Sequence, residues 1–125
     1  MKIIFDTNFL IYCAKKKLYY VEEIDNLINE NHELVVPLQV IGELERLKEK
    51  TKKGKDKEAC SLALQLLEKN KIKKVNPIGK SVDDAIVNLS KEDSKNIVCT
   101  LDREMRFELP RVILIDKRKR LRLTR

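Results

Sequence analysis

The chain has 125 residues and a formal net charge of +7, with 42% hydrophobic and 38% charged residues. This length suits one domain with a real core and is too short for two comfortable ones. No apolar stretch approaches the roughly 20 residues of a membrane helix, and the N-terminus shows no cleavage-site pattern, so we expect a cytoplasmic protein without membrane insertion or export.

The first half of the chain alternates short apolar runs with stretches of helical spacing. Ile3, Ile4 and Phe5 form a run that is typical of a strand buried on both faces. After this strand, the pattern predicts helices at about 8–16 and 20–31, a second strand at 34–36, and a helix that starts at Pro37 and ends in a lysine-rich loop around Gly54. Proline suits the first helical position because the donor that it lacks would be idle there.

The second half continues the alternation. It predicts an amphipathic helix at about 57–70, a short strand at 72–75, a helix capped by Ser81, a strand at 97–99, a short helix to about 109, and a strand at 112–115. Because helices alternate with nearly continuous apolar strands, we expect a three-layer α/β/α sandwich around a central parallel sheet, with right-handed crossovers. We assign residues 1–116 to this domain and residues 117–125 to a basic C-terminal tail.

The cysteines and the histidine narrow the chemistry. Cys13, Cys60 and Cys99 are odd in number, widely spaced and set in apolar sequence, which predicts reduced core thiols rather than a disulfide framework. His32, the single histidine, has no cysteine or histidine partner at the spacing of a zinc site. The sequence therefore argues against zinc and against histidine-based acid/base catalysis.

Basic residues concentrate in two segments. Six of the 27 lysines and arginines lie in residues 117–125, which contain no acid, and the other 21 nearly balance the 20 acids. Two basic segments on either side of an acidic site suit a polyanion held by its phosphates, although a lysine-rich loop is also a common solvated surface. The residues expected to contact RNA are Lys52, Lys53, Lys55, Lys117, Arg118, Lys119 and Arg120.

Four acidic residues, Asp6, Glu43, Asp84 and Asp102, each follow an apolar run or lie early in the helix after it. In an open α/β sheet these points meet in the crevice beyond the carboxyl ends of the strands. Four carboxylates there would repel one another unless cations balanced them, and Mg²⁺ or Mn²⁺ suits hard oxygen ligands. Two such ions can stabilise the attacking and leaving oxygens of a phosphodiester. The sequence therefore predicts a metal-dependent nuclease site.

Each acid also has a structural explanation. Asp6 and Asp102 could cap the helices that follow them, and Asp84 lies three residues after Ser81, which is a capping-box spacing. Glu43 borders the apolar face of its helix, as a surface acid with a buried stem would. The set is informative because capping could equally use Ser, Thr or Asn, and this chain carries a charge at all four places.

The motifs Ile3-Ile4-Phe5-Asp6-Thr7-Asn8, Pro37 before a helix with Glu43, Asp83-Asp84-Ala85-Ile86, and Thr100-Leu101-Asp102 resemble the PIN domain family over essentially the whole chain. The resemblance implies a ribonuclease that depends on Mg²⁺ or Mn²⁺. It assigns catalysis and metal binding to Asp6, Glu43, Asp84 and Asp102, with Asn8, Asp83 and Thr100 in support. Leu101 departs from the pattern because many members have a polar residue there, which puts one supporting hydrogen bond in question.

We therefore expect a divalent-metal-dependent endoribonuclease that hydrolyses RNA phosphodiester bonds, in rRNA processing or as a toxin. Asp6, Asp84 and Asp102 would hold one or two ions, and Glu43 would add a ligand or orient water. The resemblance leaves an antitoxin and a ribosomal precursor open as partners. PIN domains often pair, so it also implies a homodimer.

Two alternatives stay open at this point. Phosphatases of the haloacid dehalogenase type also place an aspartate after an apolar strand, but they need a second aspartate two residues later, where this chain has Asn8. The non-enzymatic alternative is an RNA-binding or assembly module on a PIN scaffold, because a fold does not certify activity. The presence of all four acids argues against that module.

Overall fold

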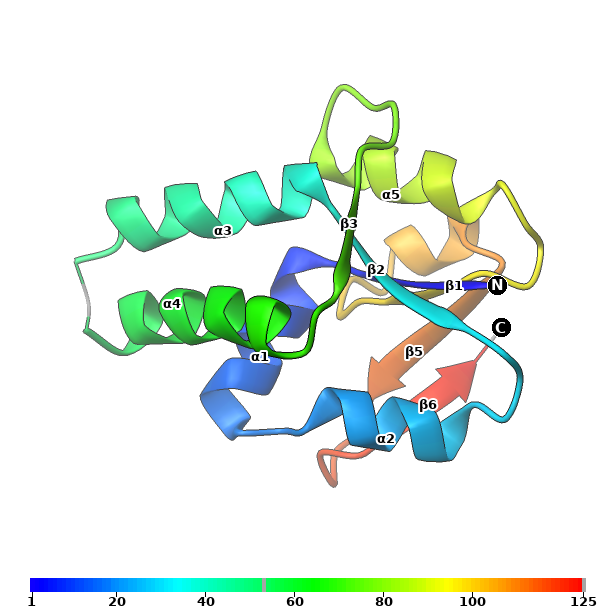
Figure 1. The fold of residues 1–125 in the computed structure, drawn as a ribbon, viewed down its shortest axis with the longest axis horizontal. Coiled ribbons are helices and arrows are strands. Elements are labelled where there is room, and N and C mark those ends of the chain that lie inside the picture. The colour runs from blue at the N-terminus through cyan, green and yellow to red at the C-terminus, as the bar shows by residue number, and fades with distance from the viewer. Residues whose placement is uncertain (53, 125) are drawn as a thin grey trace.

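The computed structural model describes residues 1–52 and 54–124, whose helices and strands alternate as the sequence predicts (Figure 1). In chain order the elements are β1 (Lys2–Phe5), α1 (Thr7–Lys16), α2 (Tyr20–Leu27), β2 (Glu33–Pro37), α3 (Leu38–Lys50), α4 (Gly54–Lys69), β3 (Lys73–Val75), α5 (Val82–Ser90), β4 (Ile97–Cys99), the 3-10 helix η1 (Met105–Glu108), β5 (Arg111–Ile115) and β6 (Leu121–Thr124). The predicted elements are confirmed, with ends that differ by a few residues, and β6 is an addition. Two details are corrected: Pro37 ends β2 and caps α3, which starts at Leu38, and Gly54 begins α4, so the expected lysine-rich loop is a short turn after Lys50.

The strands form one sheet in the order β3-β2-β1-β4-β5-β6. The pairs among β1 to β5 are parallel, and Ile4 lies between Val35 of β2 and Val98 of β4. The chain builds outward from β1 to β2 and β3, then returns to the other side of β1 with β4. The strand order therefore reverses between β1 and β4, and the crevice at such a reversal is where open α/β sheets bind ligands.

Strand β6 corrects the expectation that residues 117–125 form a tail outside the domain. Leu121–Thr124 pairs antiparallel with β5, so the sheet is mixed and not wholly parallel. Asp116 closes the hairpin, because its carboxylate accepts hydrogen bonds from Arg118, Arg120 and Arg122. The two leucines of β6 alternate with polar residues inside a run of cations, which hid the strand pattern.

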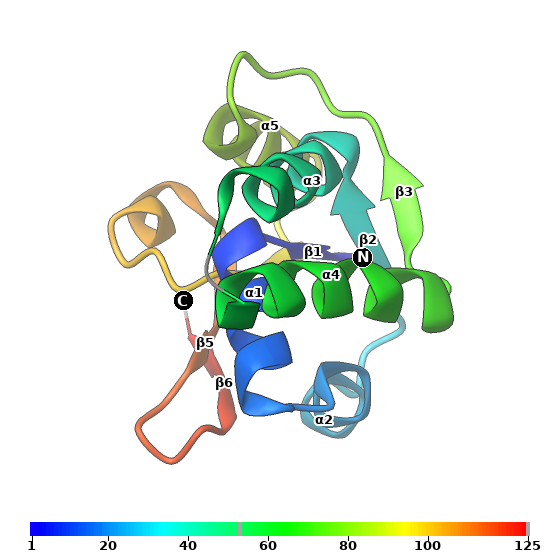
Figure 2. The same ribbon diagram turned by 90° about the vertical axis from the view of Figure 1, so that its left-hand side faces the viewer.

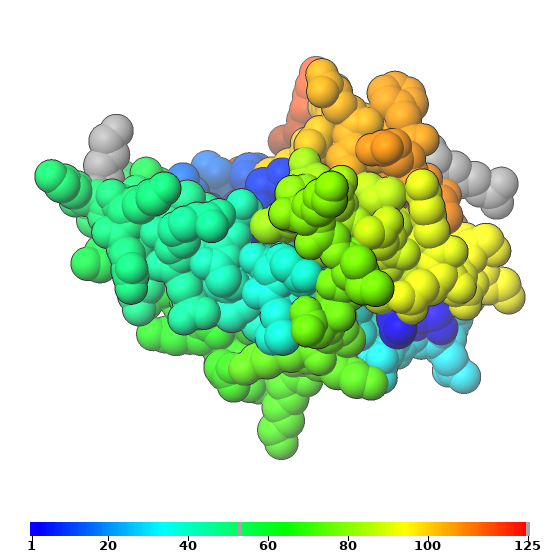
Figure 3. All heavy atoms as spheres, turned by 90° about the horizontal axis from the view of Figure 1, so that it is seen from above, coloured from blue at the N-terminus to red at the C-terminus, as the bar shows by residue number. Residues whose placement is uncertain are grey.

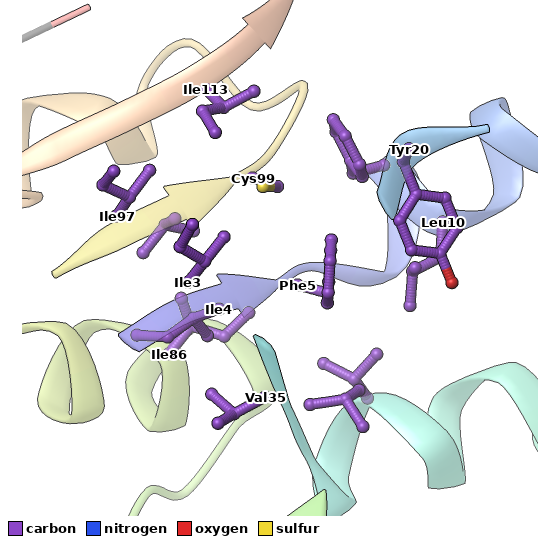
Figure 4. Close-up of a cluster of buried hydrophobic side chains, with 14 of the residues drawn as sticks. Ile3, Ile4, Phe5, Leu10, Tyr20, Val35, Ile86, Ile97, Cys99 and Ile113 are labelled. Atoms are coloured by element: carbon purple, nitrogen blue, oxygen red, sulfur yellow. The ribbon is translucent and has the colours of Figure 1, made fainter. Parts of the chain in front are cut away.

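Buried aliphatic side chains of the central strands form the core on both sides of the sheet. Figure 4 shows Ile3, Ile4, Val35, Ile97 and Ile113 in this cluster, and all are fully buried. Burying such a side chain contributes about 1.5–3 kcal/mol relative to leaving it in water. Helix α5 packs against β1 and β4, and α2 lies on the opposite side of the sheet (Figures 1 and 2). The layers therefore hold the ends of β1 and β4 firmly.

The structure confirms the expectation for the cysteines, since Cys13, Cys60 and Cys99 are all buried and free. Within the described residues, none of the helices has the length and apolarity of a bilayer-spanning segment.

Candidate active site

Asp6 lies at the carboxyl end of β1, where the sequence predicted a site residue. Its backbone N–H donates to Cys99 of β4 over 3.0 Å, which continues the ladder between the two strands. Its side chain caps α1 by accepting a hydrogen bond of 2.8 Å from the Thr7 N–H. The structural explanation of this residue is thus confirmed, yet capping occupies only one of its two carboxylate oxygens.

The second oxygen of Asp6 faces the neighbouring strand end. Thr100, the first residue after β4, donates its hydroxyl to Asp6 Oδ2 over 2.6 Å. Asn8 joins the same network, because its Oδ1 accepts from the Leu101 N–H over 3.1 Å and lies 3.5 Å from the Thr100 hydroxyl. The bond at Leu101 uses the backbone, so a leucine side chain there does not remove it. Asn8 and Thr100 are therefore part of the hydrogen-bond network around Asp6, and the supporting role that the resemblance assigns to them stays a prediction.

Asp102 follows Thr100 in the same turn. Its N–H donates to the Thr100 hydroxyl oxygen over 3.1 Å. Its Oδ1 accepts from the N–H groups of Glu104 and Met105 over 3.0 and 3.2 Å, so Asp102 also holds the start of the short segment that leads into η1. The side chain stays partly exposed at the edge of the sheet. The ends of β1 and β4 thus present two carboxylates linked through one threonine.

Glu43 and Asp83 both line an open cleft between α3 and the N-terminus of α5. The cleft is lined by Gln39, Gly42, Glu43, Arg46, Lys80, Ser81, Val82 and Asp83. The Glu43 side chain is 29% exposed, and Arg46 one turn later on α3 lies 3.5 Å from it. Ser81 caps α5 as predicted, accepting a bond of 3.1 Å from the Asp84 N–H. This cap fixes the helix start that carries the two aspartates.

The carboxylates are coupled electrostatically. Burial raises the pKa of Asp6 from 3.8 to about 6, the hydrogen bonds from Thr100 and Thr7 oppose this rise, and the charges of Asp83 and Glu43 add to it. Burial also raises the pKa of Asp83, and the charges of Asp102, Glu43, Asp84 and Glu108 raise it further. We refer to Asp6 and Asp102 at the ends of β1 and β4, together with Glu43 of α3 and Asp83 of α5, as the carboxylate cluster, because their charges act on the pKa values of Asp6 and Asp83.

The two aspartates of α5 differ in their roles. The sequence motif assigns metal binding to Asp84 and support to Asp83, whereas the structure couples Asp83 directly to Asp6, Glu43 and Asp102. Both aspartates are exposed on α5, but only Asp83 lines the cleft, and the charge of Asp84 acts through its effect on the pKa of Asp83. The sequence shows two adjacent acids but not which of them lies on the side of α5 that lines the cleft. That depends on the residue at which the helix starts.

The carboxylate cluster suits a hard divalent cation by its chemistry. Its members are all oxygen donors of the kind that Mg²⁺ and Mn²⁺ bind, and the charges of their neighbours disfavour the ionised forms of Asp6 and Asp83. No three of the described histidine, cysteine, aspartate or glutamate side chains already lie where they could hold one ion. The site therefore has the excess negative charge that a cation would relieve, without a finished set of ligands.

The predicted RNA contacts divide into two groups. Lys52 is exposed in the turn after α3 and Lys55 is exposed at the start of α4, while Lys53 lies outside the described residues. The other group, Lys117, Arg118, Lys119 and Arg120, is exposed on the β5–β6 hairpin. Viewed from above, blue atoms from the N-terminal part of the chain reach the surface between α3 (cyan to green) and the orange segment around η1 (Figure 3).

Comparisons with known proteins agree with this fold and its motifs. The family model described as "PIN like domain" matches residues 3–120, so the chain belongs to this family. The chain is 40% identical over 109 residues to Ribonuclease VapC4 of Methanocaldococcus jannaschii, covering 86% of this chain and 82% of that protein.

Solved structures share the fold at lower identity. The PIN domain endonuclease Utp24 superposes with a TM-score of 0.77 at 20% identity, covering 99% of this chain and 91% of that one. VapBC2 from Rickettsia felis, solved with a DNA fragment from its promoter, gives a TM-score of 0.57 at 18% identity, covering 93% and 100% of the two chains. The predicted fold class and family are therefore confirmed.

Proposed function

We propose that this protein is a divalent-metal-dependent endoribonuclease whose active site is the carboxylate cluster. The observation that supports this most directly is the buried Asp6 at the end of β1, whose pKa is raised to about 6 partly by neighbouring carboxylates. A purely structural helix cap needs neither burial beside other acids nor their repulsion. The similarity to a protein named Ribonuclease VapC4 supports RNA as the substrate.

The acidic residues would bind the metal ions, and the neighbouring threonines orient Asp6. Asp6 and Asp102, with Asp83 and Asp84 of α5 and Glu43 of α3, would hold one or two Mg²⁺ or Mn²⁺ ions. Such an ion lowers the pKa of water and stabilises the departing oxygen of the phosphodiester when it is bound. Thr100 and Thr7 keep the Asp6 carboxylate oriented through bonds of 2.6 and 2.8 Å. Rigid orientation of the ligands matters because small misplacements lower the rate strongly.

RNA would approach along the exposed cations of the α3–α4 turn and of the β5–β6 hairpin. Cations in such places bind phosphates without reading the sequence, and they offset the repulsion between RNA and the acidic centre. We further propose that the nuclease acts in the cytoplasm, in keeping with its free buried thiols.

An antitoxin is one partner consistent with the comparisons. The similarity to Ribonuclease VapC4 and to VapBC2 of Rickettsia felis supports a toxin role. Expression of the wild-type chain alone would then arrest growth, while the Asp6→Asn chain would not. Normal growth with the active wild-type enzyme would favour RNA maturation instead.

The competing function is an RNA-binding module without catalysis, and one variant separates the two. Purified wild-type protein should cleave RNA only with Mg²⁺ or Mn²⁺, and Asp6→Asn should lose this cleavage while keeping its circular dichroism spectrum. Glu45→Gln is the matched control, because Glu45 is an exposed acid on α3 two residues from Glu43. Tight RNA binding without metal-dependent cleavage by the wild type would favour the module.

A further inference from the structure

We propose that Phe107 is a platform for base stacking beside the carboxylate cluster and so binds a nucleotide next to the phosphate that is cut. This inference rests on the proposed function and adds a residue that binds the RNA substrate.

Phe107 is 85% exposed, although it belongs to a well-anchored segment. Met105 on one side and Leu109 on the other are both buried, so η1 is fixed to the core while the ring points to solvent. A single exposed apolar residue is common on protein surfaces and needs no explanation by itself. The position of this ring and its neighbours give it a specific role.

The segment that carries Phe107 is attached to the site. Asp102 Oδ1 accepts bonds from Glu104 and Met105 at the entry to η1. The entry to η1, two residues before Phe107, therefore borders the carboxylate cluster. Figure 3 shows orange atoms near a blue surface patch that comes from the N-terminal part of the chain.

The ring also has a cationic neighbour. The guanidinium carbon of Arg106 lies 6.0 Å from the centroid of the Phe107 ring, a distance at which a cation is attracted to an aromatic face. A base can stack on exposed ring surface, and the guanidinium can meet the adjacent phosphate. Bases inside an A-form duplex are stacked on each other and unavailable, so this arrangement selects unpaired nucleotides.

The absence of tryptophan from the chain permits a direct test. Phe107→Trp in an Asp6→Asn background gives one tryptophan in a protein that should not cut its ligand. We expect a short single-stranded RNA to quench this fluorescence on titration and a blunt RNA duplex to leave it unchanged. The matched control is Tyr19→Trp in the same background, because Tyr19 is a 75% exposed aromatic at the start of α2, beyond the far end of α1.

Quenching at position 107 alone supports stacking. Equal quenching at positions 19 and 107, or no change at 107 while RNA binds by filter retention, would overturn it. Because the readout is binding by a non-cutting variant, it does not depend on cleavage. A wild type that never cuts RNA would defeat the proposed function while position 107 could still report stacking.

Substitutions in the active protein give a second measurement. Phe107→Ala should raise KM for single-stranded RNA by roughly tenfold, in line with the loss of one stacked base, and Phe107→Tyr should keep the wild-type value. Both variants should melt like the wild type because the side chain is exposed. An unchanged KM in Phe107→Ala would contradict the proposal. A changed oligomeric state with unchanged RNA kinetics would assign the ring to a protein interface and also contradict it.

Discussion

Thr100 Oγ1 donates to Asp6 Oδ2 over 2.6 Å and so joins the ends of β1 and β4 across 94 positions of the chain. This bond stabilises the charged form of Asp6, whereas burial and the charges of Asp83 and Glu43 stabilise the protonated form. Burial dominates, and the pKa of Asp6 stands at about 6. Asp6 therefore changes its charge close to neutral pH. A single substitution that removes one of these contributions should shift the pKa of Asp6.

The first prediction concerns Thr100. Thr100→Val removes the hydrogen bond that lowers the pKa of Asp6, so this pKa should rise above about 6 and the acid limb of the pH–rate profile should move to higher pH. Thr100→Ser keeps a hydroxyl and should leave the limb where it is in the wild type. Cleavage rates between pH 5 and 8 measure the shift, and coincident profiles for Val and Ser variants would contradict the assigned role.

The second prediction concerns stability and its dependence on pH. The pKa of Asp6 is raised from 3.8 to about 6 by folding, so the folded state binds its proton more tightly, and the stability from this group is lost as pH rises between those values. Asp6→Asn should therefore raise the free energy of unfolding at pH 7 by up to about 3 kcal/mol and change little below pH 4. Urea denaturation of both proteins at several pH values gives the difference.

The sign of this effect also distinguishes the site from a simple helix cap. A cap whose charge stabilises the helix would make Asp6→Asn less stable at neutral pH. Added Mg²⁺ or Mn²⁺ should stabilise the wild type more than the Asn variant, because only the wild type retains the central charge. Equal stabilisation of the two proteins would argue that the ions bind elsewhere.

The third prediction separates Asp83 from Asp84. The charge of Asp83 raises the pKa of Asp6, so Asp83→Asn should lower that pKa and move the acid limb of the rate profile to lower pH. Asp84→Asn should move it less, because Asp84 acts on Asp83 rather than directly on Asp6. Carbon-detected NMR of the Asp6 carboxyl group in each variant measures this without reference to activity. A larger shift in Asp84→Asn would favour the assignment made from the motif.

The fourth prediction concerns the β5–β6 hairpin. Truncation at residue 116 would remove β6 from the sheet, so charge substitutions are the cleaner test. Lys117→Gln with Lys119→Gln should weaken RNA binding at low salt and lower the slope of log K against log salt by roughly 0.7 per lost phosphate contact. Lys91→Gln is a control, since Lys91 is an exposed cation at the C-terminal end of α5. Equal slopes for all three proteins would remove the hairpin from the RNA path.

Much of the fold could be predicted because its strands are short, apolar and buried on both faces. Runs such as Ile3 to Phe5 and Ile97 to Cys99 contain no alternating polar residues that would face solvent. Such runs are typical of a sheet whose two faces are both covered by helices. Strand β6 was missed because Arg122 and its neighbours gave it the composition of a tail. The pairing of β6 depends on its contact with β5 and on the turn at Asp116. The residue pattern within β6 itself shows neither of these.

The site could be predicted in its chain positions but not in its geometry. A parallel sheet brings the residues after β1 and β4 together whatever their side chains, so Asp6 and Asp102 follow from topology. The choice between Asp83 and Asp84 depends on where α5 starts, and a shift of one residue turns a helical side chain by about 100°. The exposure of Phe107 depends on which residues of η1 the core can accommodate, and four residues carry too little periodicity to show that.

The outermost strands have a consequence for how copies of this chain behave at high concentration. At one end of the sheet, β3 has only three residues, and two of them are exposed lysines, Lys73 and Lys74. At the other end, β6 carries the exposed Arg122. Short edge strands with positive charges disfavour pairing with a strand from another molecule. Such edge-to-edge pairing is a route to fibrils and precipitates. We therefore expect the protein to stay dispersed while it folds, with any self-association directed to its helices.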